Sequence, residues 1–495
     1  MDDIASIVTG CRNHLDFLPM AYYPYTRVPV GDKDLNPEDW LPDEELAKHW
    51  RKACEVARAA NEPGRFVVFP GYEWQGAGLD GDHNVFFFHD DPPFLHCDRL
   101  SQLYAEIRDR ELEALAIPHH TAYKPGVRSK NWDVHDEALS PFAEIFSHHG
   151  CSETDEENKP LRRNWNMGPG VSGGTISDGL ARGLRLGIIA SNDAHGGFGG
   201  IHGDGVMACY APALTRKDLW EAFKARHVYG VTGDRIALEF HINDAMMGDE
   251  LRATGAIDIR ARVTGSYAVD RIELLRDERV VRAYNHQGTW AAPRDGLIRA
   301  KARYEMGWGP RLPLVPELSR HRWEGEIRLS EGVIRGVEKC FRRRGQEVRL
   351  ESDRACRFDI ATPRGGRPDS PVTDAIVLEF EAPVNATLDF VSGGARETVS
   401  VLQAMSASAM IYDEAATARM ILDAFGARPQ DVYRRDQWYF LAYKVKRYRA
   451  IPQAGYRVEI QRQEPAAAGR HCYRVRVEQT NGQYAWSSPI WIEGR

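Results

Sequence analysis

The chain has 495 residues, of which 27% are charged and 43% are hydrophobic, with 64 Lys and Arg residues against 71 Asp and Glu residues. This composition is ordinary for a globular protein and excludes the disordered, collagen-like and coiled-coil classes. The net charge of −7 argues against a dedicated nucleic-acid-binding protein, which usually carries a strong basic excess. This length allows about three domains of roughly 150 residues each.

The sequence also bears on the compartment. It has no apolar run of about 20 residues, the length that a membrane-spanning helix needs. The first residues, MDDIASIVTG, include two acids and lack the basic start of a secretory signal. The 8 cysteines are scattered without a CxxC pair, which is typical of reduced thiols. We therefore expect a cytoplasmic protein that acts neither on nucleic acid nor at a membrane.

Up to about residue 235, short apolar runs alternate with longer amphipathic stretches. The patterns typical of buried strands are RFVVFPGYEW, ALAIPHH, FAEIFSHHG and LGIIASNDAH, and those typical of helices are SQLYAEIRDRELE and LTRKDLWEAFKARH. Strands that alternate with helices predict a parallel sheet or a barrel. We therefore predict an α/β domain over residues 1–235.

From residue 236 to residue 495 the pattern changes to strand-like alternation with Gly, Asp and Asn turns. It is clearest in IALEFHIN, IDIRARVTG, DRIELLRD, AIVLEFEAP and ATLDFVSG. One predicted helical insert, SAMIYDEAATARMILDAFG, interrupts it. We therefore predict a second, antiparallel β-rich domain over residues 236–495, similar to a sandwich. No Gly/Ser/Pro-rich linker precedes this domain, so we expect it to pack against the first.

Histidines and carboxylates gather where the four predicted strands of the first domain end. They are Glu73 in GYEW, His119 and His120 in IPHH, His148 and His149 in SHHG, and Asp193 and His195 in SNDAH, with His83 in GDHN as a further candidate. Imidazole and carboxylate groups are the ligands that zinc, manganese and iron prefer. Single histidines are more often ordinary loop or core residues, but four such clusters in succession favour a metal site.

The spacing within each cluster indicates which members can act together. Alternate residues of a strand share a side, so Asp193 and His195 can reach one metal ion. Adjacent residues face opposite sides, so at most one histidine of each pair is expected to be a ligand. Unless the strand has already ended, the other histidine of each pair, His119–His120 or His148–His149, is then a candidate for contact with the substrate or for supporting a ligand.

The order Glu, His, His-Gly and Asp-x-His on successive strands resembles the polymerase and histidinol phosphatase (PHP) superfamily, and the chain is similar to its DUF3604 branch. The similar motifs are GYEW followed by GDHNVFF, IPHHT, EIFSHHGCSE, IIASNDAHGG and HVYGVTGDRIAL, with a similar β-rich tail at YRVRVEQTNGQYAWSSPIWI. The resemblance implies a distorted (β/α)7 barrel that carries up to three metal ions, and mostly phosphoesterase activity.

The chain departs from this family at its N-terminal end. The first strand of the barrel, with its His-x-His motif, is apparently missing, through either a late start or divergence. Ala21, Tyr22 and Tyr23 stand where the family has Thr-Asp-His, which is a divergence in either case. We expect the two tyrosines to fill the space of the lost ligands, with at least one of them lining the pocket.

The resemblance implies a reduced set of metal sites. By this resemblance Glu73, His119 and His149 hold one ion. A second ion is completed by Asp193, His195 and, as a further candidate, His83. We therefore expect one or two divalent ions per chain, Zn, Mn or Fe.

The favoured function is metal-dependent hydrolysis of an anionic small molecule. A bound divalent ion lowers the pKa of its water toward about 7, and His120 or His148 then serves as the acid for the leaving group. By the resemblance a phosphoester is the expected substrate, and a carboxylic ester, amide or lactone is the alternative. A degenerate barrel that only binds a partner is the competing interpretation. The sequence does not predict the oligomeric state.

Overall fold

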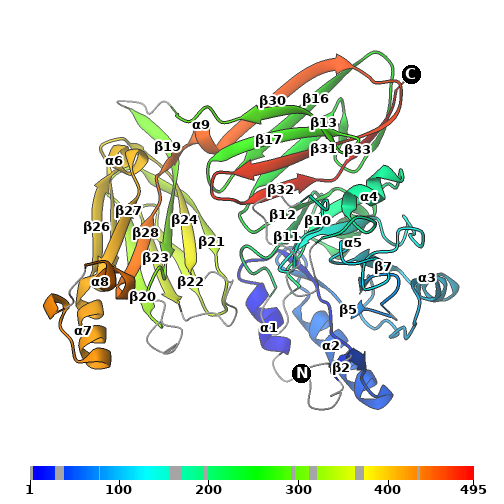
Figure 1. The fold of residues 1–495 in the computed structure, drawn as a ribbon, viewed down its shortest axis with the longest axis horizontal. Coiled ribbons are helices and arrows are strands. Elements are labelled where there is room, and N and C mark those ends of the chain that lie inside the picture. Colours follow the sequence, from blue (N-terminus) through cyan, green and yellow to red (C-terminus); the bar gives the residue numbers. More distant parts are fainter. Residues whose placement is uncertain are drawn as a thin grey trace.

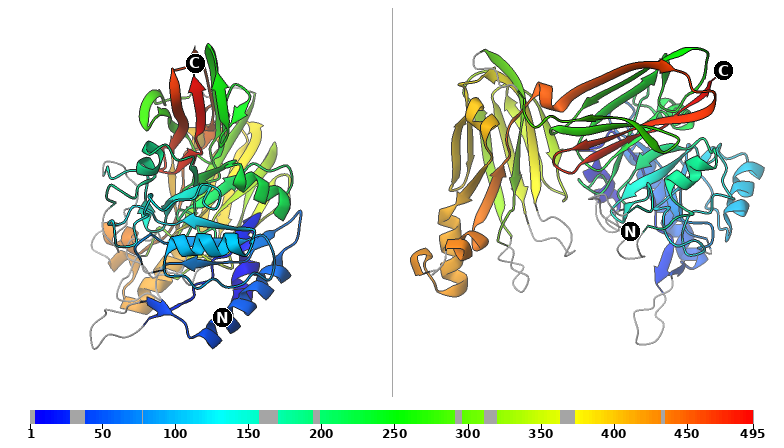
Figure 2. Two further views of the ribbon diagram at one scale, coloured as in Figure 1. Left: turned by 90° about the vertical axis from the view of Figure 1, so that its right-hand side faces the viewer. Right: turned by 45° about the horizontal axis from the view of Figure 1, so that its top comes forward.

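The computed structural model describes residues 4–27, 38–76, 78–156, 170–193, 199–290, 296–310, 320–362, 373–431 and 435–494. These residues form three lobes (Figure 1). We call them the N-terminal lobe (residues 4–231), the terminal β lobe (residues 237–285 and 457–494) and the inserted β lobe (residues 297–456). The inserted β lobe is formed by a continuous excursion of the chain between two strands of the terminal β lobe, and the right-hand view of Figure 2 shows the two lobes apart.

The N-terminal lobe combines short strands with five helices among its described residues. The helices are α1 (Ile4–Cys11), α2 (Asp43–Ala60), α3 (Leu100–Asp109), α4 (Ile176–Ala181) and α5 (Arg216–Lys224). The strands are β1 (Phe17–Pro19), β2 (Tyr25–Arg27), β3 (Glu38–Trp40), β4 (Val67–Phe69), β5 (Gly71–Trp74), β6 (His83–Phe87), β7 (Ala114–Pro118), β8 (Phe142–Ser147), β9 (Gly150–Cys151), β10 (Gly187–Ala190), β11 (Val206–Cys209) and β12 (Val228–Val231). The predicted strand patterns correspond to β4, β5, β7, β8 and β10, and the predicted helices to α3 and α5.

The predicted (β/α)7 barrel is wrong for the described residues. The structure is mostly β-sheet, with 43% strand and 19% helix, and its strands form separate sheets rather than a closed barrel. Among the described residues of this lobe, parallel pairing joins only β1 with β4 and β8 with β10, apart from an isolated bridge between Tyr22 and Tyr72. Between β5 and β7 lies β6, which pairs antiparallel with both, because the connection from β5 contains no helix to carry the chain across the sheet.

The terminal β lobe packs a large sheet against a four-stranded one. Its strands are β13 (Ala237–Ile242), β14 (Ala245–Met246), β15 (Glu250–Ala253), β16 (Ala256–Thr264), β17 (Val269–Arg276), β18 (Arg279–Asn285), β30 (Arg457–Pro465), β31 (Gly469–Gln479), β32 (Tyr484–Ser487) and β33 (Ile490–Gly494). The large sheet also contains β11 and β12 of the N-terminal lobe, since β12 pairs with β32. The predicted boundary at residue 235 therefore lies next to a sheet that both lobes share, and the two-domain division stays a prediction.

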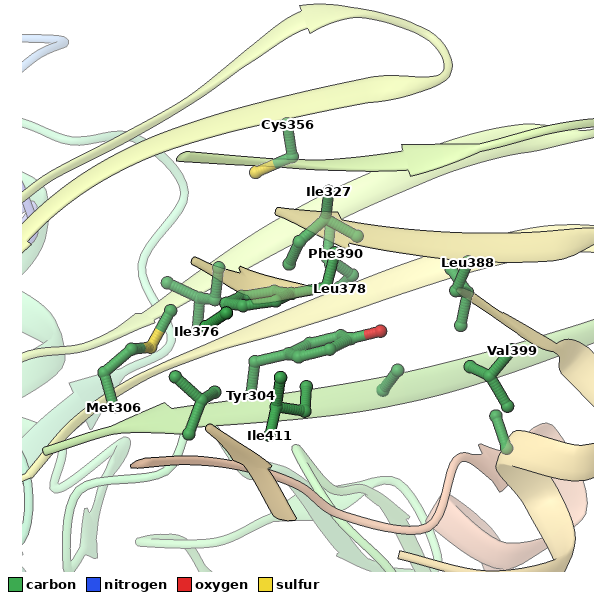
Figure 3. Packing of buried hydrophobic residues seen from close by; sticks show 14 of the residues in the cluster. Tyr304, Met306, Ile327, Cys356, Ile376, Leu378, Leu388, Phe390, Val399 and Ile411 are labelled. Carbon is green, nitrogen blue, oxygen red and sulfur yellow. The ribbon is translucent and has the colours of Figure 1, made fainter. Parts of the chain in front are cut away.

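The inserted β lobe is a sandwich of two antiparallel sheets. Its elements are β19 (Leu297–Met306), β20 (Arg322–Leu329), β21 (Val333–Cys340), β22 (Glu347–Ser352), β23 (Ala355–Ala361), β24 (Asp374–Pro383), β25 (Thr387–Ser392), β26 (Ala395–Ser400), α6 (Val401–Ser406), β27 (Ala409–Asp413), α7 (Glu414–Phe425), a 3-10 turn at Pro429–Asp431, α8 (Arg435–Leu441), β28 (Tyr443–Arg447), β29 (Ile451–Pro452) and α9 (Gln453–Tyr456). Figure 3 shows its core, in which the rings of Tyr304 and Phe390 stack with centroids 5.3 Å apart. The predicted helical insert corresponds to β27 and α7.

Among the described residues no helix is both long and apolar enough to cross a membrane. This finding agrees with the absence of a long apolar run in the sequence.

The three lobes meet at the buried carboxylate of Asp234. Its Oδ1 accepts hydrogen bonds from His202 Nε2 of the N-terminal lobe at 2.7 Å and from Arg303 Nη1 of the inserted β lobe at 3.2 Å. Its Oδ2 accepts from Gln479 and Asn481 of the terminal β lobe, both at 2.8 Å. Burial alone would raise the pKa of Asp234, but Arg303 and His202 hold it well below its usual value. This carboxylate therefore joins all three lobes as a charged, fully bonded group.

We predict that Asp234→Ala lowers the free energy of unfolding by about 3–5 kcal/mol, because it leaves the buried Arg303 guanidinium without its counter-charge. Urea titration followed by circular dichroism measures this change. Asp91→Ala is the matched control, since Asp91 pairs with Arg58 at the surface, where an ion pair contributes about 0–1 kcal/mol. Equal effects of the two substitutions would contradict the role of Asp234.

Candidate metal centre

The ends of four strands bring a set of histidines and carboxylates together. Glu73 lies on β5, His119 and His120 follow β7, His149 follows β8, and Asp193 follows β10. The ligand atoms of Glu73, His119 and His120 all lie within 4.8 Å of one another, and so do those of His120, His149 and Asp193. The side chains of all five residues are more than nine-tenths buried. We call these five residues, with Asp82 and Glu144, the candidate metal centre.

The start of β6 places Asp82 in the candidate metal centre and directs the side chain of His83 away from it. Because β6 runs antiparallel to β5 and β7, its first residues lie beside the last residues of both neighbours. Glu73 is paired with Asn84, whereas His83 is paired with Trp74 and therefore shares the opposite face of the sheet. His83 Nδ1 bonds the Gly81 carbonyl at 2.9 Å, and burial lowers the pKa of His83 well below its usual value. The structure thus does not bring His83 together with the other predicted ligands.

Asp193 is the point on which the imidazoles converge. Its Oδ2 lies 2.6 Å from His149 Nε2 and 3.3 Å from His119 Nε2. Burial alone would raise the pKa of Asp193, but His119 and His149 hold it well below its usual range. Asp193 has a φ of +53°, in the left-handed region that non-glycine residues rarely adopt. Such outliers cluster at active and ligand sites, so this conformation makes Asp193 a candidate functional residue.

Glu144 orients the His119 ring through the ring nitrogen Nδ1, which faces away from Asp193. Its Oε2 lies 2.8 Å from His119 Nδ1, and it also accepts a hydrogen bond from Ser191. Its Oε1 accepts the backbone N–H of His120 at 3.0 Å. With Nδ1 bound to a carboxylate, Nε2 of His119 points at Glu73 and Asp193, which is the arrangement of a histidine ligand held by an outer carboxylate. Burial alone would lower the pKa of His119, but Glu144 and Asp193 raise it well above its usual value.

His120 lies at the centre of the cluster, beside both ligand groups. Its Nε2 is 3.3 Å from Asp82 Oδ2, and Asp82 also accepts hydrogen bonds from Arg128, at 2.7 Å from Nε. Its Nδ1 is buried and has no hydrogen-bond partner among the described residues. His120 has a φ of +30°, again in the region that costs strain. Burial raises the pKa of Asp82 to about 7 although Arg128 opposes it.

The two remaining predicted site residues differ in what the structure describes. His148 Nδ1 bonds the Asn192 carbonyl at 2.9 Å and lies 3.8 Å from Asp193 Oδ2, so His148 borders the loop that carries Asp193. His195 lies outside the described residues. The predicted pairing of Asp193 with His195 therefore stays a prediction.

Tyr22 and Tyr23 stand at the edge of the site. Tyr22 turns its hydroxyl to His49 Nδ1, 3.2 Å away on α2. The Tyr23 hydroxyl accepts from Gln75 Nε2 at 3.3 Å, and the same nitrogen donates to Glu73 Oε1 at 2.8 Å. Both residues border the cavity that contains Glu73 and Asp193. At least one of the two tyrosines was expected to line the pocket, and both do. The predicted number of metal ions stays a prediction.

The charges of the cluster fit a bound cation. Glu73, Glu144 and Asp193 carry buried carboxylates, while the guanidinium of Arg128 is bound to the fourth carboxylate, that of Asp82. Buried carboxylates need an opposite charge close by, because charge is costly in a medium of low dielectric constant. A mixed set of imidazole and carboxylate donors suits Zn, Mn or Fe. The buried Nδ1 of His120 and Oδ1 of Asp82, without partners among the described residues, add unused donor atoms.

A third group of donor atoms, in His202, Asp234 and Cys340, does not fit a cation. Arg303 Nη1 already lies 3.2 Å from Asp234 Oδ1 and 3.6 Å from Cys340 Sγ. Burial raises the pKa of the Cys340 thiol to about 12, so it stays protonated. These three residues lie at the junction of the three lobes, which we call the lobe junction. The guanidinium of Arg303 supplies the positive charge there.

Sequence reasoning missed Asp82, Glu144 and Tyr123. Asp82 precedes a strand rather than following one, and Glu144 lies inside FAEIFS, where a carboxylate in an apolar strand was the available signal. Tyr123 is buried with its hydroxyl unbonded among the described residues, and its ring lies 4.7 Å from that of His120 and 6.1 Å from that of His149. Its only signal was its place three residues after the histidine pair.

The comparisons with known proteins give similarity without an assigned activity. The DUF3604 family, described as a protein of unknown function, matches residues 198–265. An uncharacterised protein of Chlamydia pneumoniae is 28% identical over 276 residues, which cover 50% of this chain and 42% of that protein. An uncharacterised protein of Chlamydia trachomatis is 30% identical over 205 residues, which cover 38% of this chain and 32% of that protein.

The chain thus spans less than half the length of these curated relatives, and no solved structure matches it. The DUF3604 match begins after Asp193, so it includes His202 and Asp234 of the lobe junction but none of the candidate metal centre. These matches do not name the PHP superfamily, so that part of the predicted relationship stays a prediction, whereas the similarity to DUF3604 is confirmed over the matched residues.

Proposed function

We propose that this chain is a metal-dependent hydrolase that acts on a phosphoester, as the resemblance to the PHP superfamily implies. The observation that carries the proposal is the convergence of His119 Nε2 and His149 Nε2 on Asp193 Oδ2, beside Glu73, in a buried cluster. Glu73, His119, His149 and Asp193 would hold the metal. Such an ion, when bound, polarises the scissile group and lowers the pKa of its water to about 7.

His120 is the residue that we assign to proton transfer. Its Nε2 faces the Asp82 carboxylate at 3.3 Å, which leaves Nδ1 as the nitrogen that can take a proton from the attacking water. The same nitrogen then gives that proton to the oxygen of the leaving alcohol, so the imidazole ends as it began. The geometry supports His148 less in this role, because its Nδ1 is bonded to the Asn192 carbonyl.

Tyr123 and Arg128 support the charge that develops on the substrate. The buried Tyr123 hydroxyl has no other partner among the described residues and stands next to His120 and His149, so it can donate to a substrate oxygen. A preorganised donor of this kind acts strongly in a site that excludes water. Arg128 holds Asp82 in place and lies 3.8 Å from Glu73.

Glu73→Gln is expected to lower the bound metal to well below the wild-type content and to abolish hydrolysis, because an amide replaces an anionic ligand. Elemental analysis of the purified protein and a phosphoester assay after addition of Zn²⁺, Mn²⁺ or Fe²⁺ measure the two effects. Glu55→Gln, at an exposed carboxylate on α2, should change neither. Negligible metal in the wild-type protein under all three conditions would overturn the proposal and favour a binding module.

Glu144→Gln should weaken metal affinity by about 10–100-fold, as loss of an outer carboxylate on a ligand histidine typically does. The amide can still hydrogen-bond His119 Nδ1, but it no longer supplies the negative charge that makes the ligand nitrogen basic. Competition with a fluorescent chelator measures the dissociation constant, with Glu55→Gln again as the control. An unchanged constant would show that His119 is not a ligand.

Tyr123→Phe should lower kcat by about 10²–10³-fold, the usual cost of one lost donor to a developing charge. The metal content should remain at the wild-type value, because the phenol is not among the proposed ligands. Tyr210→Phe removes a hydroxyl that bonds the Leu238 carbonyl outside the site and serves as the control. A wild-type kcat for Tyr123→Phe would exclude the hydroxyl from the reaction.

A further inference from the structure

A cavity of about 790 Å³ begins at the candidate metal centre and is lined mainly by the N-terminal lobe. Glu73, His119 and Asp193 line one end of it. Its volume lies in the range of about 300–1,000 Å³ that is typical of small-molecule sites. The cavity therefore gives the candidate centre a binding space much larger than a phosphate group alone requires.

Away from the centre the cavity wall is mainly apolar. The apolar lining comes from several elements and includes Leu18, Phe86, Ile117, Ile189, Met207 and Phe223. An apolar cavity is poorly suited to water, and its wall loses van der Waals contacts unless something fills it. The wall thus favours an occupant with an apolar body and a polar group at the end next to Asp193.

The outer end of the cavity is bordered by α1. Ile4 and Ile7 of this helix line the cavity and are half-buried. Two cations hold the chain that follows α1: Arg235 Nη2 donates to the His14 carbonyl at 2.6 Å, and Lys339 Nζ donates to the Asn13 carbonyl at 2.5 Å. The buried carboxylates and a partly exposed helix thus line the same cavity, which has room for a ligand larger than a phosphate group.

We propose that the cavity binds the alkyl chain of a long-chain phosphomonoester, whose phosphate lies at the end of the cavity next to Glu73, His119 and Asp193, which would hold the metal. This inference rests on the proposed hydrolytic function and names its substrate class. In the reaction the oxygen of a water forms a bond to phosphorus, and the bond from phosphorus to the alkoxy oxygen breaks. The proton of that water ends on the alkoxy oxygen, so the products are a long-chain alcohol and inorganic phosphate.

The test measures the binding of butyl-, octyl- and dodecylphosphonate to the full-length, metal-loaded protein by calorimetry. Phosphonates resist hydrolysis, so binding is separated from turnover. Affinity should rise with chain length by up to about fourfold per methylene, the factor expected for a fully buried CH₂ group. Binding of the longer chains should also show a more negative heat-capacity change.

Met207→Trp places a larger side chain in the cavity and should remove most of the gain from butyl- to dodecylphosphonate. Met207→Phe should reduce the same gain to a smaller extent, and it keeps the test available if the larger indole prevents folding. Met410→Trp is the matched control, because Met410 is also half-buried on a strand but lies in the inserted β lobe. This control should retain the full dependence on chain length.

Equal affinity for the three phosphonates, or a wild-type gain in both Met207 variants, would overturn the inference. Either result is expected if the cavity is filled by polypeptide instead of an alkyl chain. If the protein hydrolyses p-nitrophenyl phosphate but binds the three phosphonates with equal affinity, the inference is overturned and the proposed function still stands. Binding that increases with chain length in a protein that hydrolyses no phosphoester would overturn the proposed function and support the ligand class.

Discussion

The buried carboxylate of Asp234 is the interaction on which the arrangement of the three lobes depends. It accepts hydrogen bonds from each lobe, and the adjacent Arg235 reaches the His14 carbonyl behind α1. A carboxylate without water is stable only when every lone pair finds a donor. The relative position of the lobes, and with it the outer wall of the cavity, is thereby tied to one charged residue.

The sequence was sufficient to find the strands that carry the candidate centre and most of the residues in it. An apolar run followed by polar residues marked β5, β7, β8 and β10, and the structure brings Glu73, His119, His149 and Asp193 together at their ends. This prediction works because burial of a strand and the end of that burial both leave a local pattern. It needs no knowledge of which strand lies beside which.

The sequence interpretation was wrong about which strands pair with one another and in which direction. Period-two alternation identifies a strand, but it does not say that β16 pairs with β30, about two hundred residues further along the chain. Nor does it say that β6 runs antiparallel between β5 and β7. The antiparallel direction of β6 is incompatible with the alternating β/α order of a barrel. It also places Asp82 in the candidate metal centre and His83 on the face of the sheet that carries Trp74.

The candidate centre and the cavity reinforce each other electrostatically. Apolar walls keep the local dielectric constant low, which strengthens the attraction between the buried carboxylates and a cation. The same walls make each uncompensated carboxylate more costly, so the cluster of Glu73, Glu144 and Asp193 is stable only with positive charge among them. Within the chain that charge comes from Arg128, 3.8 Å from Glu73, and from His119, whose pKa Glu144 and Asp193 raise against the effect of burial. If the proposed divalent ion binds, it would replace the proton of His119 Nε2, so metal binding and deprotonation of this histidine would be one coupled event.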